Sequence, residues 1–288
     1  MIILATYLPF YRIHEINEYF EKNINIIKPN KAIIYIDNIY KDKQREILEK
    51  IIPDHIEVRT GNWRNRNDTW IAMLKDFHTL SGDFIVVDSD NVVDPVFPEI
   101  HMKLRNNPVY TILEFESWGR NPSHLLTRSR KIGDVDLNGE IRPLYAYKVY
   151  DDSIGGIFRG GPLFFIGPKQ VVAFSKLPDL DLVTRVERAL SAVDPWLRNF
   201  ISDETLLGVL AYLMGIKEVP WTIASHHYHH GSTSGSATKI LVASAHYQFS
   251  KGLLREFKNS VFIRYNIKYL LSIMKNLRLL TKGGLGGR

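Results

Sequence analysis

Residues 82–94 read Gly-Asp-Phe-Ile-Val-Val-Asp-Ser-Asp-Asn-Val-Val-Asp, and this stretch indicates the class of fold. Its first part, residues 83–87, is a short run rich in β-branched residues, which is typical of a strand buried on both faces of a parallel sheet. The run ends abruptly in Asp88-Ser89-Asp90. Ligands of open α/β sheets bind beyond the carboxyl ends of the strands, so this triplet is a candidate binding site.

Asp88 and Asp90 are candidate ligands of a divalent metal. Two carboxylates that lie two residues apart in an extended chain point the same way, so both can bind one hard cation. Mg²⁺ and Mn²⁺ favour carboxylate and phosphate oxygens. We therefore expect Mn²⁺ or Mg²⁺ between this pair and a diphosphate. The alternative is a simple strand-to-loop turn, in which Asp88 caps the backbone and Asp90 faces water.

The residues before this stretch alternate between two hydrophobic patterns. Extended apolar runs predict strands, and a helical spacing of apolar residues predicts helices between them. The predicted strands are 2–8, 31–36 and 55–59, and the predicted helices are 13–27, 41–52 and 68–80. This alternation implies a parallel, right-handed doubly wound sheet.

The second half of the chain has a different pattern. We expect strands at 109–115, 162–166 and 219–225, and helices at 168–176, 182–192 and 203–214. Residues 119–152 are rich in charged and aromatic residues and are predicted to be mostly loop. Residues 232–243 are small and polar, which indicates a further loop.

Length and composition limit the class of protein. A chain of 288 residues with 45% hydrophobic residues forms one large domain, or one domain with an appendage. Because the chain has no cysteine, disulfides, thiolate metal sites and cysteine nucleophiles are excluded. We see neither a signal peptide nor a membrane span, so we expect a cytoplasmic protein, with peripheral attachment to the cytoplasmic membrane face as an option.

The positive charge of the chain is concentrated at its C-terminus. Residues 251–288 contain nine Lys or Arg and one acid, so the rest of the chain is slightly acidic although the whole carries +6. Residues 251–282 have the pattern of a basic amphipathic helix, which suits either an anionic membrane surface or docking on the catalytic domain. We expect residues 283–288 to be flexible. No nucleic-acid recognition motif is present, so no nucleic acid is expected.

In the order and spacing of its motifs, the chain resembles the GT-A-fold glycosyltransferases, which carry a DXD motif and use nucleotide sugars. The resemblance covers roughly residues 1–231. Asp88-Ser89-Asp90 matches the DXD motif, and Asp203-Glu204, at the start of a predicted helix, matches the acidic catalytic motif. The resemblance implies further nucleotide or donor contacts from several segments: Thr6, Tyr7, Leu8, Asp37, Arg66, Asn67, Ser89, Gly160 and Gly161.

The histidine cluster at residues 226–230 is the candidate source of a third metal ligand. If the chain stays extended there, His227 and His229 share one face, and we expect His227 first and His229 second. A late histidine ligand is common in retaining members of the family. A carboxylate of Asp203 or Glu204 acting as the base fits an inverting transfer instead. The stereochemical outcome therefore stays open.

The resemblance implies an α/β fold: a GT-A-like, doubly wound, mixed and mainly parallel sheet flanked by helices, with a C-terminal helical appendage. Residues 1–250 would form the catalytic domain, with a nucleotide-binding half (1–107) and an acceptor-side half (108–250). The implied activity is metal-dependent transfer of a sugar from a nucleoside diphosphate sugar to a hydroxyl acceptor, which is a glycan or a lipid-linked molecule.

Other interpretations of the same residues are open. The triplet at 88–90 also fits the nucleophile motif of haloacid-dehalogenase-type phosphatases, and a related fold serves nucleotidyltransferases. A non-catalytic protein that binds a sugar nucleotide or a membrane surface is a third alternative. Individual residues have structural explanations: Asp203 as a helix N-cap, Gly160 and Gly161 in a tight turn, and Arg66 as a solvated charge.

Overall fold

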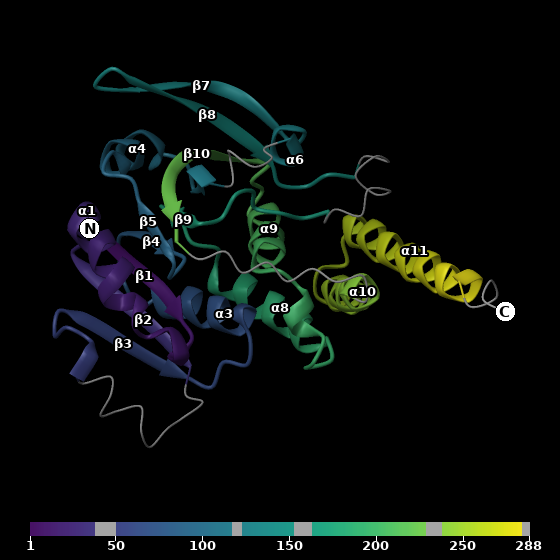
Figure 1. The fold of residues 1–288 in the computed structure, drawn as a ribbon. Coiled ribbons are helices and arrows are strands. Elements are labelled where there is room, and N and C mark those ends of the chain that lie inside the picture. The colour runs from purple at the N-terminus through teal and green to yellow at the C-terminus, as the bar shows by residue number, and fades with distance from the viewer. Residues whose placement is uncertain (38–49, 117–122, 153–162, 229–237, 284–288) are drawn as a thin grey trace.

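One β-sheet runs through the whole protein in the computed structural model, which describes residues 1–37, 50–116, 123–152, 163–228 and 238–283 (Figure 1). Within these residues ten strands form the sheet, in the order β3-β2-β1-β4-β9-β6-β10-β8-β7, with β5 paired to β10. The strands are β1 (Ile2–Leu8), β2 (Lys31–Asp37), β3 (Ile56–Gly61), β4 (Asp83–Val87), β5 (Asn91–Val93), β6 (Val109–Glu114), β7 (Ser129–Leu137), β8 (Glu140–Lys148), β9 (Val171–Phe174) and β10 (Glu218–His227).

Helices cover the sheet and extend beyond it at the C-terminal end. The α-helices are α1 (Glu21–Ile27), α3 (Arg66–Phe77), α4 (Phe97–Leu104), α6 (Ser123–Leu126), α8 (Leu180–Ser191), α9 (Asp203–Leu213), α10 (Thr238–Phe257) and α11 (Ser260–Gly283). Shorter turns are η1 (Phe10–Arg12), η2 (Ile16–Phe20) and η3 (Arg198–Phe200). No helix among the described residues is long and apolar enough to cross a bilayer.

The N-terminal half has the predicted parallel arrangement. Strands β3, β2, β1 and β4 are neighbours and all run parallel. Ile3, Leu4 and Ala5 of β1 are completely buried, as expected for a strand covered on both faces. The predicted helix at 41–52 lies almost entirely outside the described residues.

The predicted helix at 168–176 is wrong, because residues 171–174 form β9 in the middle of the sheet. This strand runs antiparallel to both β4 and β6. Val171 and Val172 are fully or almost fully buried, and β-branched residues favour such positions. The strand expected at 162–166 is also absent among the described residues 163–166, where Phe164 makes only an isolated bridge to Tyr150.

The loop-rich stretch expected at 119–152 is wrong as well. Residues 129–148 form an antiparallel hairpin of β7 and β8. Asn138 and Gly139 connect the strands with φ angles of 57° and 96°. An Asn-Gly pair with two positive φ angles is the preferred two-residue hairpin turn. The Asn-Gly dipeptide was thus a usable signal for this hairpin.

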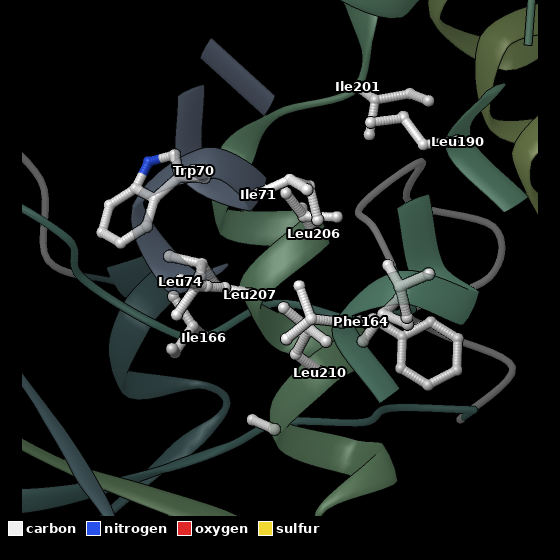
Figure 2. Packing of buried hydrophobic residues seen from close by; sticks show 14 of the residues in the cluster. Trp70, Ile71, Leu74, Phe164, Ile166, Leu190, Ile201, Leu206, Leu207 and Leu210 are labelled. Carbon is white, nitrogen blue, oxygen red and sulfur yellow. The ribbon is translucent and has the colours of Figure 1, made fainter. Parts of the chain in front are cut away.

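Of the three hydrophobic clusters among the described residues, the two larger ones lie on opposite faces of the sheet. The larger contains buried residues of α3, α8, α9, α10 and α11, and the smaller contains those of α1 and α4. In the larger cluster, Ile71 and Leu74 of α3 pack with Leu206 and Leu207 of α9 (Figure 2). This packing fixes the two helices relative to each other, and their N-termini carry candidate site residues.

Helix α10 crosses the predicted boundary between the domain and its C-terminal appendage. Because α10 starts at Thr238, the predicted loop at 232–243 is wrong for residues 238–243, and the boundary at residue 250 falls inside a helix. Phe249 and Leu253 of α10 are completely buried in the larger cluster. Helix α10 is therefore part of the domain core.

Candidate functional site

Asp203 lies at the N-terminus of α9 and is almost completely buried, with 4% of its surface exposed. The N-cap of this helix is Ser202, whose hydroxyl accepts a hydrogen bond from the backbone N–H of Thr205 at 3.2 Å. The interpretation of Asp203 as the N-cap is therefore wrong. Its Oδ2 atom instead accepts a hydrogen bond from Trp70 Nε1 at 3.0 Å and pairs with the Lys169 ammonium.

Asp88 belongs to the same group of charges. Its Oδ1 atom lies 3.0 Å from Arg66 Nη2 and 3.2 Å from Lys169 Nζ. Arg66 Nε in turn lies 3.7 Å from Asp203 Oδ2. Two carboxylates and two cations therefore form one network, here called the charge cluster: Asp88, Asp203, Arg66 and Lys169.

The fold explains how residues so distant in sequence meet in the charge cluster. Asp88 directly follows β4, and Lys169 precedes β9, the neighbour of β4. The Asp88 N–H donates to the Gln170 carbonyl at 2.9 Å, which continues the ladder past both strand ends. Arg66 and Asp203 are the first residues of α3 and α9, which pack against each other (Figure 2).

The two acidic residues at the start of α9 have different protonation behaviour. Burial alone would raise the pKa of Asp203, but the charges of Lys169 and Arg66 outweigh it and hold the pKa well below its usual range. Burial and the neighbouring Asp203 charge raise the pKa of Glu204 to about 7. At neutral pH, Asp203 is therefore an anion, whereas Glu204 is present in both its protonated and its ionised form.

Lys169 is a site residue that the sequence analysis missed. Its side chain is only 2% exposed. Burial lowers the pKa of a lysine, but the Asp203 and Asp88 carboxylates outweigh this effect and raise the pKa of Lys169. The sequence did contain a signal for it, since Lys169 is a single lysine between the apolar segments 163–166 and 171–174. A lysine in such a position is expected to be buried, and buried lysines are almost always paired with acids.

Asp90 lies in a second polar group that joins four parts of the chain. Its Oδ2 atom lies 2.9 Å from Arg12 Nη2 and 3.2 Å from His227 Nε2. The other imidazole nitrogen of His227, Nδ1, lies 3.3 Å from Glu114 Oε2. Burial would raise the pKa of Asp90, but its hydrogen bond to Arg12 and the Arg12 charge lower it.

Strand pairing brings His227 to Asp90. In the antiparallel β5–β10 pair, His227 is opposite Asn91, the residue after Asp90. The Tyr228 N–H also donates to the Asp90 carbonyl at 3.1 Å. Of the two histidines predicted as metal ligands, the structure places His227 beside Asp90, and His229 lies outside the described residues.

Some of these side chains suit a divalent metal. Among the described residues, no group of three or more histidine, aspartate or glutamate side chains could hold one alone. Asp90 Oδ2 and His227 Nε2, however, are 3.2 Å apart. Adjacent ligands of an octahedral ion are separated by about 3 Å, and Mg²⁺ commonly takes only one or two carboxylates together with substrate phosphates. The donor set therefore fits a metal shared with a phosphorylated ligand.

The predicted donor contacts from the first two strands occupy different environments. Thr6 is buried, and its hydroxyl donates to the Val87 carbonyl at 2.7 Å, which fixes β1 against the end of β4. Leu8 is packed in the smaller hydrophobic cluster. Tyr7 is half-buried near Asp37, and burial and the Asp37 charge together raise the pKa of Tyr7. Tyr7 and Asp37 thus lie close together at the carboxyl edge of the sheet.

The remaining predicted donor contacts are Ser89, Asn67, Gly160 and Gly161. Ser89 is buried between the two aspartates of the triplet. Asn67 is also buried, and its Nδ2 donates to the Ile201 carbonyl at 2.8 Å, so this residue ties α3 to the segment before α9. Gly160 and Gly161 lie outside the described residues.

Comparisons with known proteins were made by sequence and by structure. No family model matches the sequence, and no curated protein matches it significantly. Among solved structures, a mannosyltransferase from Pyrobaculum calidifontis, in complex with GDP-Man and Mn²⁺, aligns with all of this chain and 76% of its own, at 11% identity and a TM-score of 0.51.

Two further structures are less similar. Residues 1–349 of TarS from S. aureus align with 94% of this chain and 71% of their own, at 12% identity and a TM-score of 0.47. A nucleoside-diphosphate-sugar pyrophosphorylase from Vibrio cholerae aligns with 77% of this chain and 91% of its own, at 12% identity and a TM-score of 0.41. The likeness to the mannosyltransferase, together with the observed sheet, confirms the predicted α/β, GT-A-like fold.

Proposed function

We propose that the protein is a metal-dependent glycosyltransferase that moves a sugar from a nucleoside diphosphate sugar to a hydroxyl acceptor, either a glycan or a lipid-linked molecule. The main support is that the Asp88–Asp90 triplet joins the charge cluster on one side to His227 on the other. The mannosyltransferase of the same fold was solved with a nucleotide sugar and Mn²⁺, which agrees with this proposal.

In this proposal, Asp90 and His227 hold the divalent metal together with phosphate oxygens of the donor, while Asp88 stays in the charge cluster. When bound, such an ion stabilises the negative charge that develops on the leaving diphosphate. Arg66 has a half-exposed side chain beside Asp88, so its guanidinium can also contact phosphate oxygens. The buried Lys169 keeps Asp203 ionised and holds the carboxylates of Asp88 and Asp203 in position.

Glu204 is the proposed general base. Both acidic residues at the start of α9 were candidates, but Asp203 is already engaged by Lys169, Trp70 and Arg66. A base works best when its pKa is near the working pH, and the pKa of Glu204 is about 7. In this assignment Glu204 accepts the proton of the acceptor hydroxyl, and Asp203 positions the start of the helix.

The phosphatase alternative is less consistent with the sheet. The strand that carries the triplet, β4, has a parallel neighbour in β1 but an antiparallel neighbour in β9. A doubly wound phosphatase core is built on parallel strands. A direct assay separates the two activities: with Mn²⁺, the protein is expected to hydrolyse a nucleotide sugar slowly and to leave a generic aryl phosphate intact.

The metal role is tested by thermal unfolding of the wild type and Asp90→Ala. In a panel of UDP, GDP and CDP, one nucleotide with Mn²⁺ is expected to raise the melting temperature of the wild type by roughly 5–10 °C at about 100 times its Kd. The nucleotide without Mn²⁺ should give little shift, and Asp90→Ala should lose the metal-dependent part. Equal stabilisation of the variant would reject the role of Asp90.

Glu114 is expected to be a positioning residue for His227. Its carboxylate lies 3.3 Å from His227 Nδ1 and is 6% exposed, so it can orient the ring with Nε2 toward Asp90. Carboxylates behind a metal-ligating histidine contribute about 10–100-fold to metal affinity. Glu114→Gln should weaken Mn²⁺ binding by such a factor, measured by the paramagnetic resonance signal of free Mn²⁺. Glu140→Gln, an exposed acid on β8, is the matched control.

A further inference from the structure

The two faces of α11 have different surroundings. Phe262, Tyr265 and Tyr269 are buried in the larger hydrophobic cluster, so this face packs on the domain. The outer face carries six large apolar side chains that are 40–52% exposed. These residues, here called the α11 stripe, are Ile263, Ile267, Leu270, Leu271, Met274 and Leu277.

The spacing of the α11 stripe shows that it is one continuous surface. Five of its members follow each other at intervals of four, three, four and three residues, which keeps them on one side of a helix. From residue 263 to residue 277 the stripe is about 21 Å long, at 1.5 Å per residue. Figure 1 places α11 at the edge of the molecule, away from the sheet. In the described part of the chain, each side chain of the stripe therefore keeps at least 40% of its surface exposed.

The charge beside the α11 stripe indicates which partner it fits. Helix α11 contains five Lys or Arg residues and no acid. At 100° per residue, the four whose side chains are described (Arg264, Lys268, Lys275 and Arg278) lie on the same side of the stripe. Lys275 and Arg278 are exposed, while Arg264 pairs with Asp152 and Lys268 is buried. A surface that is apolar in the middle and basic along one edge complements an anionic lipid bilayer.

A second copy of this chain fits the same surface less well. If two α11 stripes packed together, the cations of both helices would lie at one interface, and α11 offers no acid to pair with them. A bilayer accepts the apolar side chains and supplies the missing negative charge. We propose that the outer face of α11 docks flat on an anionic membrane surface. This docking does not depend on the glycosyltransferase activity.

Vesicle flotation of the full chain tests the proposal. The wild type is expected to float with phosphatidylcholine vesicles that contain phosphatidylglycerol, and not with pure phosphatidylcholine. Ile267→Gln/Leu271→Gln should weaken binding roughly tenfold or more because two apolar anchors are lost. Lys275→Gln/Arg278→Gln should weaken it by a similar factor and reduce its dependence on salt.

A matched control separates docking from general hydrophobicity. Met102→Gln/Ile141→Gln changes two apolar residues that are 60% and 68% exposed in other parts of the surface, and it should bind vesicles like the wild type. Circular dichroism should show an unchanged fold for every variant. Failure of the wild type to bind phosphatidylglycerol vesicles, or full binding by the stripe variant, would overturn the proposal. A dimer that the stripe variant dissociates, without vesicle binding, would assign the stripe to a second copy instead.

Discussion

Lys169→Met is expected to lower the free energy of unfolding by about 3–5 kcal/mol, the usual effect of removing one partner of a buried ion pair. The Lys169 ammonium pairs with Asp203 Oδ2 and lies 3.2 Å from Asp88 Oδ1. Without it, the buried Asp203 loses its main compensating charge. Urea unfolding at pH 7, read by tryptophan fluorescence, measures the loss.

The control for this prediction is the double variant Lys169→Met/Asp203→Asn. An asparagine still accepts the hydrogen bond from Trp70 but carries no charge, so we expect the double variant to regain much of the lost stability. If it is no more stable than the single variant, the loss does not come from an uncompensated charge.

The same ion pair predicts a pH dependence. The pKa of Asp203 is lower in the folded protein than in the unfolded chain, so its contribution to stability is complete above the unfolded value of about 3.9 and falls at lower pH. Loss of Lys169 removes the largest cause of that lowered pKa. The difference in stability between the wild type and Lys169→Met should therefore shrink as the pH falls below about 4.

Glu204→Gln is expected to reduce kcat by about 10²–10⁴-fold, the usual contribution of a general base. The wild-type rate should rise with pH through about 7, as Glu204 loses its proton. The variant should lack this rise, because a glutamine does not titrate. The test is donor and acceptor turnover measured from acid to weakly alkaline pH.

Two further measurements distinguish a catalytic role of Glu204 from a structural one. The variant should keep the nucleotide- and Mn²⁺-dependent rise in melting temperature, since Glu204 is not a proposed ligand of either. Asp203→Asn should lower stability and move the rise of the pH profile to lower pH, because the Asp203 charge that helps to raise the pKa of Glu204 is lost. If Asp203→Asn abolishes turnover while Glu204→Gln keeps both rate and pH profile, the base is Asp203.

Asp88 and Asp203, which the structure brings into one charge cluster, could be singled out in the sequence because each follows a clear local signal. Asp88 comes directly after a buried apolar run, and Asp203 opens a helix with leucines at core spacing. The packing of α9 against α3 then brings Asp203 to the end of β4. The sequence could not show that Lys169 lies between them, since that contact depends on the placement of β9.

The errors in secondary structure also have physical causes. Residues 171–174 form a run too short for its periodicity to separate a strand from a helix, and tertiary pairing with β4 and β6 decides the outcome. In the β7–β8 hairpin, many side chains face solvent, which hides the alternation of apolar residues. There, the Asn138-Gly139 turn is more informative than the strands that it joins.

The position of β9 has a consequence for how the protein folds during synthesis. Strands β4 and β6 are joined only through β9, in which Val171 pairs with Val87 and Ile112. Until residue 174 has left the ribosome, both strands keep an unpaired edge, and such edges invite aggregation. The long separation in sequence also favours slow folding. A fragment that ends near residue 107 should therefore self-associate through the unpaired edge of β4. Co-expression of the missing C-terminal fragment should suppress this self-association.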